Sequence, residues 1–252
     1  MKTKFLPIFL LALAGKAFSQ TRHTDTVWCA GTMVKFYATC MQEQPGIQFL
    51  HVHENEKTAV EACNKMMEKY GHGCFVTWQS LNDRYIRFKL GGDSFVMDPN
   101  RIFSARGLEA TLRKNGAYSK AAFEAGNKVA QAFLEKYVNG KHLLVAMHNN
   151  NDDAGGLTIR SFKSEAKEIY INPQRDEDDF FLTTDAYIYQ FLKQRKFNIV
   201  LQKPGVKDDG SLSVYAAKHQ IPYLNVEAQH GHLSQQMEML DAVMELINQR
   251  FQ

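Results

Sequence analysis

Four potential metal ligands fall within six positions of the stretch FLHVHENE, residues 49–56: His51, His53, Glu54 and Glu56. Catalytic zinc is bound by His nitrogen and carboxylate oxygen, with one position left open for water. His53 would end a strand and Glu56 would open the next helix. A turn of this length could bring both onto one ion at the carboxyl edge of a sheet. His51 and Glu54 have the same spacing, and a solvated turn is the competing interpretation.

A third candidate ligand lies in the stretch LLVAMHNNND, residues 143–152. The continuous apolar run predicts a buried strand, and His148 comes at its end, before three asparagines. If this strand runs parallel to the first, His148 reaches the same edge of the sheet. A strand-end histidine that is satisfied by hydrogen bonds is the alternative.

Two further stretches carry groups suited to bind a carboxylate and to move a proton. In FVMDPNRIF (95–103), Pro99 makes the backbone irregular, and Asn100 and Arg101 follow it. The planar guanidinium fork matches a carboxylate, and the alternative is a structural Arg101 that pairs with Asp98 or with a backbone carbonyl. Glu227 ends the apolar stretch PYLNVEA and could act as a general base or be an ordinary strand-end acid.

The elements that would hold these groups alternate between strand-like and helix-like patterns, which predicts an α/β fold. We expect a single domain, with a mixed, largely parallel sheet and helices on both faces. The expected strands cover residues 48–53, 74–79, 84–90, 142–148, 198–202 and 222–228, and the expected helices 58–70, 119–138, 183–196 and 233–251. The acidic run from Asp176 to Asp179 is expected to be a solvated loop, and the turn-rich stretch 202–211 a loop near the site.

The first 19 residues have the pattern of an export signal, with early lysines, the apolar run FLPIFLLALA and small residues before Gln20. We therefore expect a mature domain over 20–252, exported to the periplasm or secreted, without a membrane anchor. The formal charge of +3 comes from three lysines in this segment, which leaves 27 basic and 27 acidic residues. A neutral domain argues against nucleic acid as a partner.

All four cysteines, Cys29, Cys40, Cys63 and Cys74, lie in the first third of the chain. An even number in an exported protein suggests disulfides, and four cysteines allow three pairings. Free buried thiols are the alternative. No CxxC spacing occurs, so we do not expect these residues to bind metal.

Taken in order, the four site stretches resemble the zinc carboxypeptidase superfamily, which includes carboxypeptidases, murein peptide amidases and the succinylglutamate desuccinylase–aspartoacylase branch. HENE (53–56) is similar to that branch's H-G-N-E zinc motif, and DPNRIF (98–103) to its D-L-N-R-I-F motif. HNNND (148–152) resembles the segment with the third ligand. GSL (210–212) before YLNVE (223–227) is closer to the carboxypeptidase and amidase pattern.

The resemblance implies Zn²⁺ on His53, Glu56 and His148, a substrate carboxylate on Asn100 and Arg101, and Glu227 as general base. The family has a further arginine that polarises the scissile carbonyl. Arg84 and Arg87 both lie nearby outside any recognisable motif, and Arg87 is our substrate-binding candidate. The family's clamping tyrosine has no obvious match, and Tyr215 and Tyr223 are candidates. The small C-terminal domain of aspartoacylases has no counterpart after Glu227.

We therefore expect an exported zinc-dependent hydrolase of an amide bond in a small peptide or N-acyl amino acid with a free carboxylate. The chemistry would use a zinc-bound water and a glutamate base. The alternative is a catalytically weak exported binding protein for zinc or carboxylate ligands, since the clamping tyrosine is missing.

Overall fold

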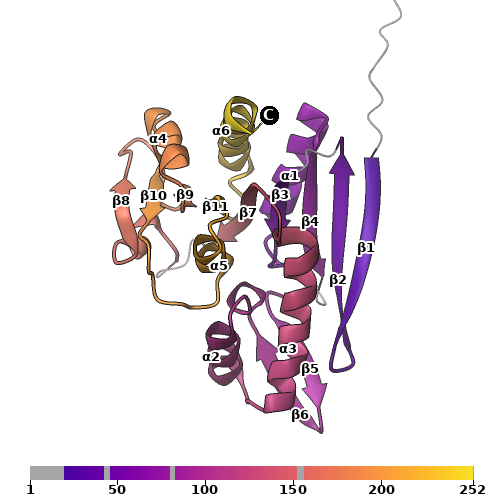
Figure 1. The fold of residues 1–252 in the computed structure, drawn as a ribbon. Coiled ribbons are helices and arrows are strands. Elements are labelled where there is room, and N and C mark those ends of the chain that lie inside the picture. The colour runs from indigo at the N-terminus through magenta and orange to yellow at the C-terminus, as the bar shows by residue number, and fades with distance from the viewer. Residues whose placement is uncertain (1–19, 43–45, 80–82, 152–155, 252) are drawn as a thin grey trace, which may run out of the picture.

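A nine-stranded mixed sheet runs through the part of the chain that this computed structural model describes, residues 20–42, 46–79, 83–151 and 156–251. Figure 1 shows the sheet with helices packed around it. The predicted export signal at 1–19 lies outside the described residues. In spatial order the strands are β1 (Gln20–Cys29), β2 (Thr32–Met41), β4 (Gly73–Gln79), β3 (Ile47–His51), β7 (Leu143–Asn150), β11 (Tyr223–Gln229), β9 (Phe180–Thr183), β10 (Ile199–Gln202) and β8 (Ala166–Tyr170).

The sheet is parallel at its centre, where β4, β3, β7 and β11 run in one direction. Outside this centre β9 and β10 form a further parallel pair. The pairs β1–β2, β2–β4, β9–β11 and β8–β10 are antiparallel. The expectation of a mixed α/β sheet is therefore confirmed, but the sheet is less parallel than expected. The N-terminal hairpin, β1–β2, and the short strands β8 and β9 did not show in the sequence as strands, and they supply the antiparallel pairings.

Helices cover both faces of the sheet, as expected. The helices are α1 (Lys57–Tyr70), α2 (Ala105–Asn115), α3 (Lys120–Phe133), α4 (Ala186–Gln194), α5 (Leu212–Lys218) and α6 (Leu233–Arg250). Helices α1, α4 and α6 bury their apolar sides in one core with Phe49, Val145 and Leu224. Helices α2, α3 and α5 contribute to a second core with Phe36 and Trp78. No helix in the described ranges is long and apolar enough to cross a membrane.

Several predicted elements agree with the structure to within a few residues. The Ser119 hydroxyl accepts a hydrogen bond from the Ala122 N–H and caps α3, which continues through a π-turn, Leu134–Val138. Helix α4 begins at Ala186 because the Asp185 carboxylate caps it. The strand expected at 84–90 begins only at Ile86, as β5 (Ile86–Leu90), which pairs with β6 (Asp93–Met97) in a separate hairpin.

The acidic run is not fully solvated as expected, because Asp179 is buried. Its carboxylate accepts the N–H of Gln229 at 2.9 Å and contacts Nδ1 of His232 at 3.1 Å. Asp179 therefore fastens the C-terminal end of β11 to the start of α6. The stretch 202–211 does connect β10 to α5 as a loop, as expected.

One disulfide joins Cys40 on β2 to Cys74 on β4, which are register partners in the sheet. Cys29 and Cys63 are buried free thiols. Both interpretations of the cysteines thus apply, each to two of the four residues. The bridge covalently closes the loop that contains β3 and α1, and so supports the turn on which the first two candidate ligands lie.

Candidate metal centre

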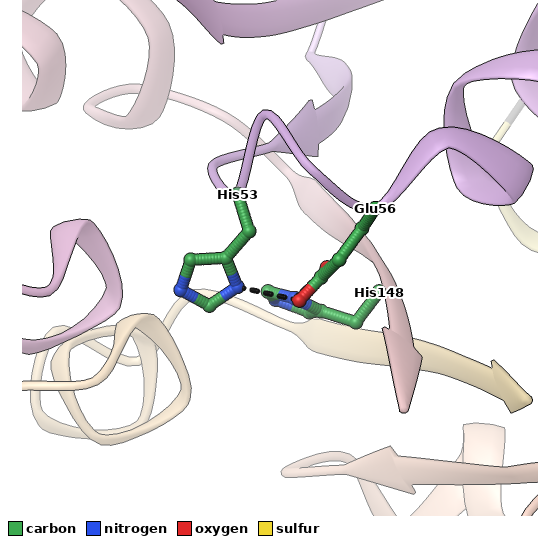
Figure 2. Close-up of side chains that lie close together, drawn as sticks. All are labelled: His53, Glu56 and His148. Carbon is green, nitrogen blue, oxygen red and sulfur yellow. Dashed lines mark hydrogen bonds and ion pairs between the residues drawn. The ribbon is translucent and has the colours of Figure 1, made fainter. Parts of the chain in front are cut away.

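His53, Glu56 and His148 meet at the carboxyl edge of the central parallel strands. Strand β3 ends at His51, and the carbonyl of His53 accepts the N–H of Glu56 at 3.0 Å, which closes the turn before α1. His148 lies near the end of β7, the parallel neighbour of β3. Adjacent parallel strands present their ends on the same side, so this placement follows from the strand order. Figure 2 shows the three side chains converging.

The Glu56 carboxylate lies between the two imidazoles. Its Oε1 is 2.8 Å from His53 Nδ1, and its Oε2 is 3.0 Å from His148 Nδ1. One ligand atom from each residue lies within 4.8 Å of the others, and all three side chains are buried. In a tetrahedral zinc site with bonds near 2.0–2.1 Å, donor atoms are roughly 3.4 Å apart. The donor set and its spacing fit a divalent metal of this kind.

A second carboxylate supports His53 from its other side. His53 Nε2 contacts Asp98 Oδ1 at 2.8 Å, and the same oxygen accepts the N–H of Asn100 at 2.8 Å. With the Nε2 proton donated to Asp98, Nδ1 faces Glu56 and would be the nitrogen that binds a metal ion. In metal-binding histidines the N–H of the second ring nitrogen commonly donates a hydrogen bond in this way. The sequence motif contained Asp98, but nothing in the sequence showed that its partner would be His53 rather than Arg101.

The competing ligand register, His51 with Glu54, is not the one that the structure brings together. His51 Nε2 contacts the backbone carbonyl of Glu56 at 3.1 Å, so this buried ring holds the turn rather than facing His148. Burial lowers the pKa of His51 to about 4, which keeps the ring neutral.

Asn149 joins the candidate metal ligands to two helices. Its Oδ1 accepts the N–H of Ala59 at the start of α1, at 2.7 Å, and its own N–H donates to Glu56 Oε2 at 3.2 Å. Its Nδ2 donates to Gln236 Oε1 on α6 at 3.0 Å, and Gln236 Nε2 donates in turn to the carbonyl of His148 at 3.0 Å. These buried bonds fix the positions of both Glu56 and His148.

Burial and opposite charges compete in setting the pKa values of the cluster, and at His148 burial prevails over the charge of Glu56 and lowers the pKa. Burial alone would lower the pKa of His53, but the charge of Glu56 and the bond to Asp98 outweigh it and raise that pKa to about 9. Burial opposes ionisation of Glu56 and Asp98 as well, yet the neighbouring imidazoles hold the pKa of Glu56 well below its usual range, and His53 and Arg84 lower that of Asp98. The cluster thus keeps two carboxylates ionised in a buried site.

Glu227 lies on β11 directly opposite His148 in the parallel register with β7. It is buried, and Asn225 Nδ2 donates to its Oε2 at 3.1 Å. Burial, followed by the charge of Glu56, raises the pKa of Glu227 to about 8. A carboxylate with a raised pKa beside a metal-binding triad suits proton transfer near neutral pH.

Asn100 and Arg101 line the same cavity from the short 3₁₀ turn η1 (Pro99–Arg101). Asn100 Oδ1 accepts the N–H of Leu212 at 3.1 Å, and its Nδ2 has no hydrogen-bond partner among the described residues. Arg101 Nη1 donates to the carbonyl of Asn100 at 2.7 Å, and its Nε lies 3.6 Å from Asp209. An amide donor and a partly exposed guanidinium are therefore available to a carboxylate in the cavity.

The structure places Arg84, and not Arg87, at the cavity. Arg84 Nη1 donates to Glu56 Oε1 at 2.7 Å, and Arg84 Nη2 lies 4.0 Å from Asp98 Oδ2. Arg87 is on β5, where it pairs with Asp83 and does not line the cavity. Our substrate-binding candidate Arg87 is thus replaced by Arg84, because β5 begins two residues after Arg84 and turns Arg87 away.

Of the two tyrosine candidates, Tyr223 lines the cavity and is buried, whereas the Tyr215 hydroxyl donates to Asn139 at the surface. Burial, followed by the charge of Glu227, raises the pKa of Tyr223 well above its usual range, so its hydroxyl stays protonated.

The cavity has a volume of about 660 Å³ and contains the three candidate ligands, Glu227, Arg84, Asn100 and Arg101. Its other lining residues include Asn150, Leu182, Asp209 and Asn225, together with Glu165, and the sequence interpretation had assigned none of them. The sequence could have predicted that Asn225 lines the cavity, because residues two apart on a strand share a face and Glu227 is two residues later. Glu165 comes from the far edge of the sheet and carries no sequence signal.

No family model matches the chain, and no curated protein matches it in sequence. Among solved structures it is similar to an aspartoacylase family protein from Mesorhizobium loti, at 12% identity and a TM-score of 0.49, over 95% of this chain and 69% of that one. It is also similar to a succinylglutamate desuccinylase/aspartoacylase from Rhodobacter sphaeroides, at 12% identity and a TM-score of 0.48, over 91% and 66%.

A third similar structure is that of thrombin activatable fibrinolysis inhibitor, at 11% identity and a TM-score of 0.47, over 87% of this chain and 67% of that one. The chain spans about two thirds of the length of all three structures. The first two carry the name of the branch that the motifs resemble. Function has to be inferred from the geometry of the site itself, because identities this low carry no information on substrate.

Proposed function

We propose that this protein is an exported zinc-dependent hydrolase of an amide bond in a small peptide or N-acyl amino acid that carries a free carboxylate. One observation carries the proposal. The buried triad of His53, Glu56 and His148 shares its cavity with Glu227, whose position on β11 is in register with His148 on β7. A metal-binding set beside a carboxylate with a raised pKa is the arrangement that metal-assisted hydrolysis needs.

When bound, zinc would supply Lewis-acid polarisation of a carbonyl and a lowered pKa for a water molecule. Glu227 can then accept a proton and later release it to the leaving amine, since positive charge beside it favours its ionised form. The guanidinium of Arg84 lies at the same edge of the cavity, where negative charge would develop on the carbonyl oxygen of the substrate. Asn100 and Arg101 would bind the substrate carboxylate through the amide Nδ2 and the guanidinium.

Export is part of the proposal and has two supports. The first 19 residues have the pattern of a signal, and the Cys40–Cys74 disulfide fits an oxidising compartment. An extracytoplasmic peptide or scavenged N-acyl amino acid would then be the substrate.

The variant Glu227→Gln tests the mechanism, because it preserves shape and removes the base. Zinc content and melting temperature should stay near those of the wild type, while kcat for a peptide or N-acyl amino acid substrate falls by about 10²–10⁴-fold. The exposed Glu168 on β8 provides a control, since Glu168→Gln removes the same charge outside the cavity. An unchanged kcat in zinc-loaded, folded Glu227→Gln would contradict the proposed mechanism.

The binding-protein alternative makes a different prediction for the same preparations. Zinc-loaded wild-type protein would bind carboxylate ligands but hydrolyse no member of a panel of peptides and N-acyl amino acids. If the wild type hydrolyses a substrate and Glu227→Gln does not, the binding-protein alternative is excluded.

A further inference from the structure

Strand β1 forms one edge of the nine-stranded sheet, and no strand of the described ranges pairs with its outer side. It is ten residues long, and its register with β2 runs without a shift from Gln20 to Cys29. Figure 1 shows β1 at the border of the molecule with no labelled element beyond it. A long, regular edge strand without proline is a template on which a further strand can pair.

The opposite edge of the same sheet is protected against such pairing. Strand β8 has only five residues, which include the charged Lys167 and Glu168, and its pairing with β10 is interrupted by a register shift between Leu201 and Gln202. Short length, charge and an irregular ladder all discourage pairing with another chain. Strand β1 has neither the short length nor the irregularity, which favours a partner on its edge.

The turn of the β1–β2 hairpin determines which backbone groups of β1 point outward. Two residues with positive φ separate the register partners Cys29 and Thr32, as a tight hairpin turn requires. The residues that flank such a turn form a hydrogen-bonded pair, and hydrogen-bonded positions then alternate along an antiparallel ladder. Every second residue from Gln20 to Trp28 therefore directs its N–H and C=O away from β2, where a second strand could bind them.

The side chains of β1 are complementary to those of a second copy of the chain in one antiparallel register. With a two-fold axis at Thr24, His23 lies opposite Asp25 of the partner subunit, so an imidazole faces a carboxylate on both sides of the axis. An axis at Asp25, His23 or Arg22 would instead place two identical titratable side chains opposite each other. The Asp25 carboxylate already lies 2.6 Å from the ammonium of Lys136, which offsets the approach of the second carboxylate.

The same register gives a partner to the most exposed large apolar side chain of the described residues. Trp28 is 56% exposed, and its register partner on β2, Met33, is 41% exposed. In the paired strands Trp28 lies opposite Gln20 and diagonal to Arg22 of the partner subunit, a spacing that long and aromatic side chains bridge. The indole therefore gains a cation–π contact with a guanidinium when the edge is covered.

We propose that two copies of this protein pair through their β1 strands, antiparallel about Thr24, and form one continuous sheet across a two-fold axis. The interface is isologous, because each contact occurs twice. Strands β2 and β4 separate it from β3 and the candidate metal ligands, so each subunit keeps its own site. The pairing rests neither on bound metal nor on the proposed hydrolysis.

Analytical ultracentrifugation over a series of protein concentrations measures the association directly. The wild type should approach the mass of two chains as the concentration rises. Thr24→Pro should raise the dissociation constant by about tenfold or more, because proline removes an outward N–H at the centre of the pair yet is tolerated on an edge strand whose N–H faces solvent. Thr24→Val keeps this N–H and is the matched control, with a dissociation constant within about twofold of the wild type. The melting temperature of dilute, monomeric protein checks that Thr24→Pro is folded.

Two charge variants test the register without relying on proline. Thr26 lies opposite Arg22 of the partner subunit when the axis is at Thr24, and two such pairs form in each dimer. Thr26→Glu should therefore tighten the dimer by about 2- to 30-fold, and Thr26→Lys should weaken it by a similar factor.

Three results would each overturn the pairing through β1. They are a wild type that stays monomeric at every concentration, a dimer that folded Thr24→Pro leaves unchanged, and dissociation constants that shift in the same direction in Thr26→Glu and Thr26→Lys.

Discussion

Replacement of Asp98 by asparagine should weaken zinc binding without unfolding the site. Asp98 Oδ1 accepts from His53 Nε2 at 2.8 Å, and the substituted amide would keep an oxygen there and could still accept the N–H of Asn100. What the substitution removes is the negative charge behind the imidazole. A hydrogen bond to a charged group stabilises by about 1.5–3 kcal/mol and a neutral one by about 1, so the loss is about 0.5–2 kcal/mol.

That loss corresponds to a zinc dissociation constant roughly 2- to 30-fold higher, and the upper end of this range reaches the usual effect of removing a partner of a metal-binding histidine. The assay is competition with a chromophoric zinc chelator at one fixed pH, because protons compete with the metal for His53. Melting temperature of the metal-free proteins checks that the turn at Asn100 is intact.

Asp93→Asn is the matched control, since Asp93 is an exposed carboxylate on β6, five residues away on the same segment. It removes one negative charge from the protein without touching the site. The reasoning is refuted if Asp98→Asn and Asp93→Asn both bind zinc within twofold of the wild type, because the contact with His53 would then contribute nothing to metal affinity.

Two further predictions concern the loop before α5 and the start of α4. A Cβ on Gly210 would lie 2.2 Å from the carbonyl oxygen of Arg101, so Gly210→Ala should lower the free energy of unfolding by about 2–4 kcal/mol. The control, Gly205→Ala, is also at positive φ but in open space, and should lower it by about 1 kcal/mol. Equal losses for the two variants in denaturant titrations would contradict this. Asp185→Asn should cost about 1 kcal/mol at pH 7, because Asp185 caps α4 and pairs with Arg250 at 2.7 and 2.9 Å. Burial alone would raise the pKa of Asp185, but the ion pair with Arg250 outweighs burial and the pKa is lowered. The difference in unfolding free energy between wild type and variant should therefore persist above the ordinary pKa near 4 and vanish as the pH falls through the folded-state pKa. A difference that stayed constant in urea titrations from pH 7 to pH 2 would contradict this.

Much of the site could be read from the sequence because its residues end apolar runs. His148 and Glu227 follow continuous buried strands, and in parallel strands such ends meet at one edge. His53 and Glu56 bracket the turn between a strand and a helix with recognisable periodicity. Local pattern thus determined the elements and, through them, which side chains could approach a common point.

Other parts of the site depended on which strands became neighbours. The choice of His53 over His51 needed the backbone carbonyl of Glu56 as a partner for His51, and the choice of Arg84 over Arg87 needed the exact start of β5. The pairing of Cys40 with Cys74 followed from the register of β2 with β4. None of these contacts leaves a mark on the local sequence pattern.

The wall of the cavity shows the same division most clearly. Glu165 and Asn225 are 60 positions apart in the chain, and two short strands that the sequence did not reveal as a pair, β9 and β10, stand between them in the sheet. The sequence by itself identified the candidates for binding metal and moving a proton, since each lies at the end of an apolar run or in the turn that follows one. Only the tertiary structure decided what surrounds them, because the order of strands in a sheet depends on the summed packing of distant segments and not on any one of them.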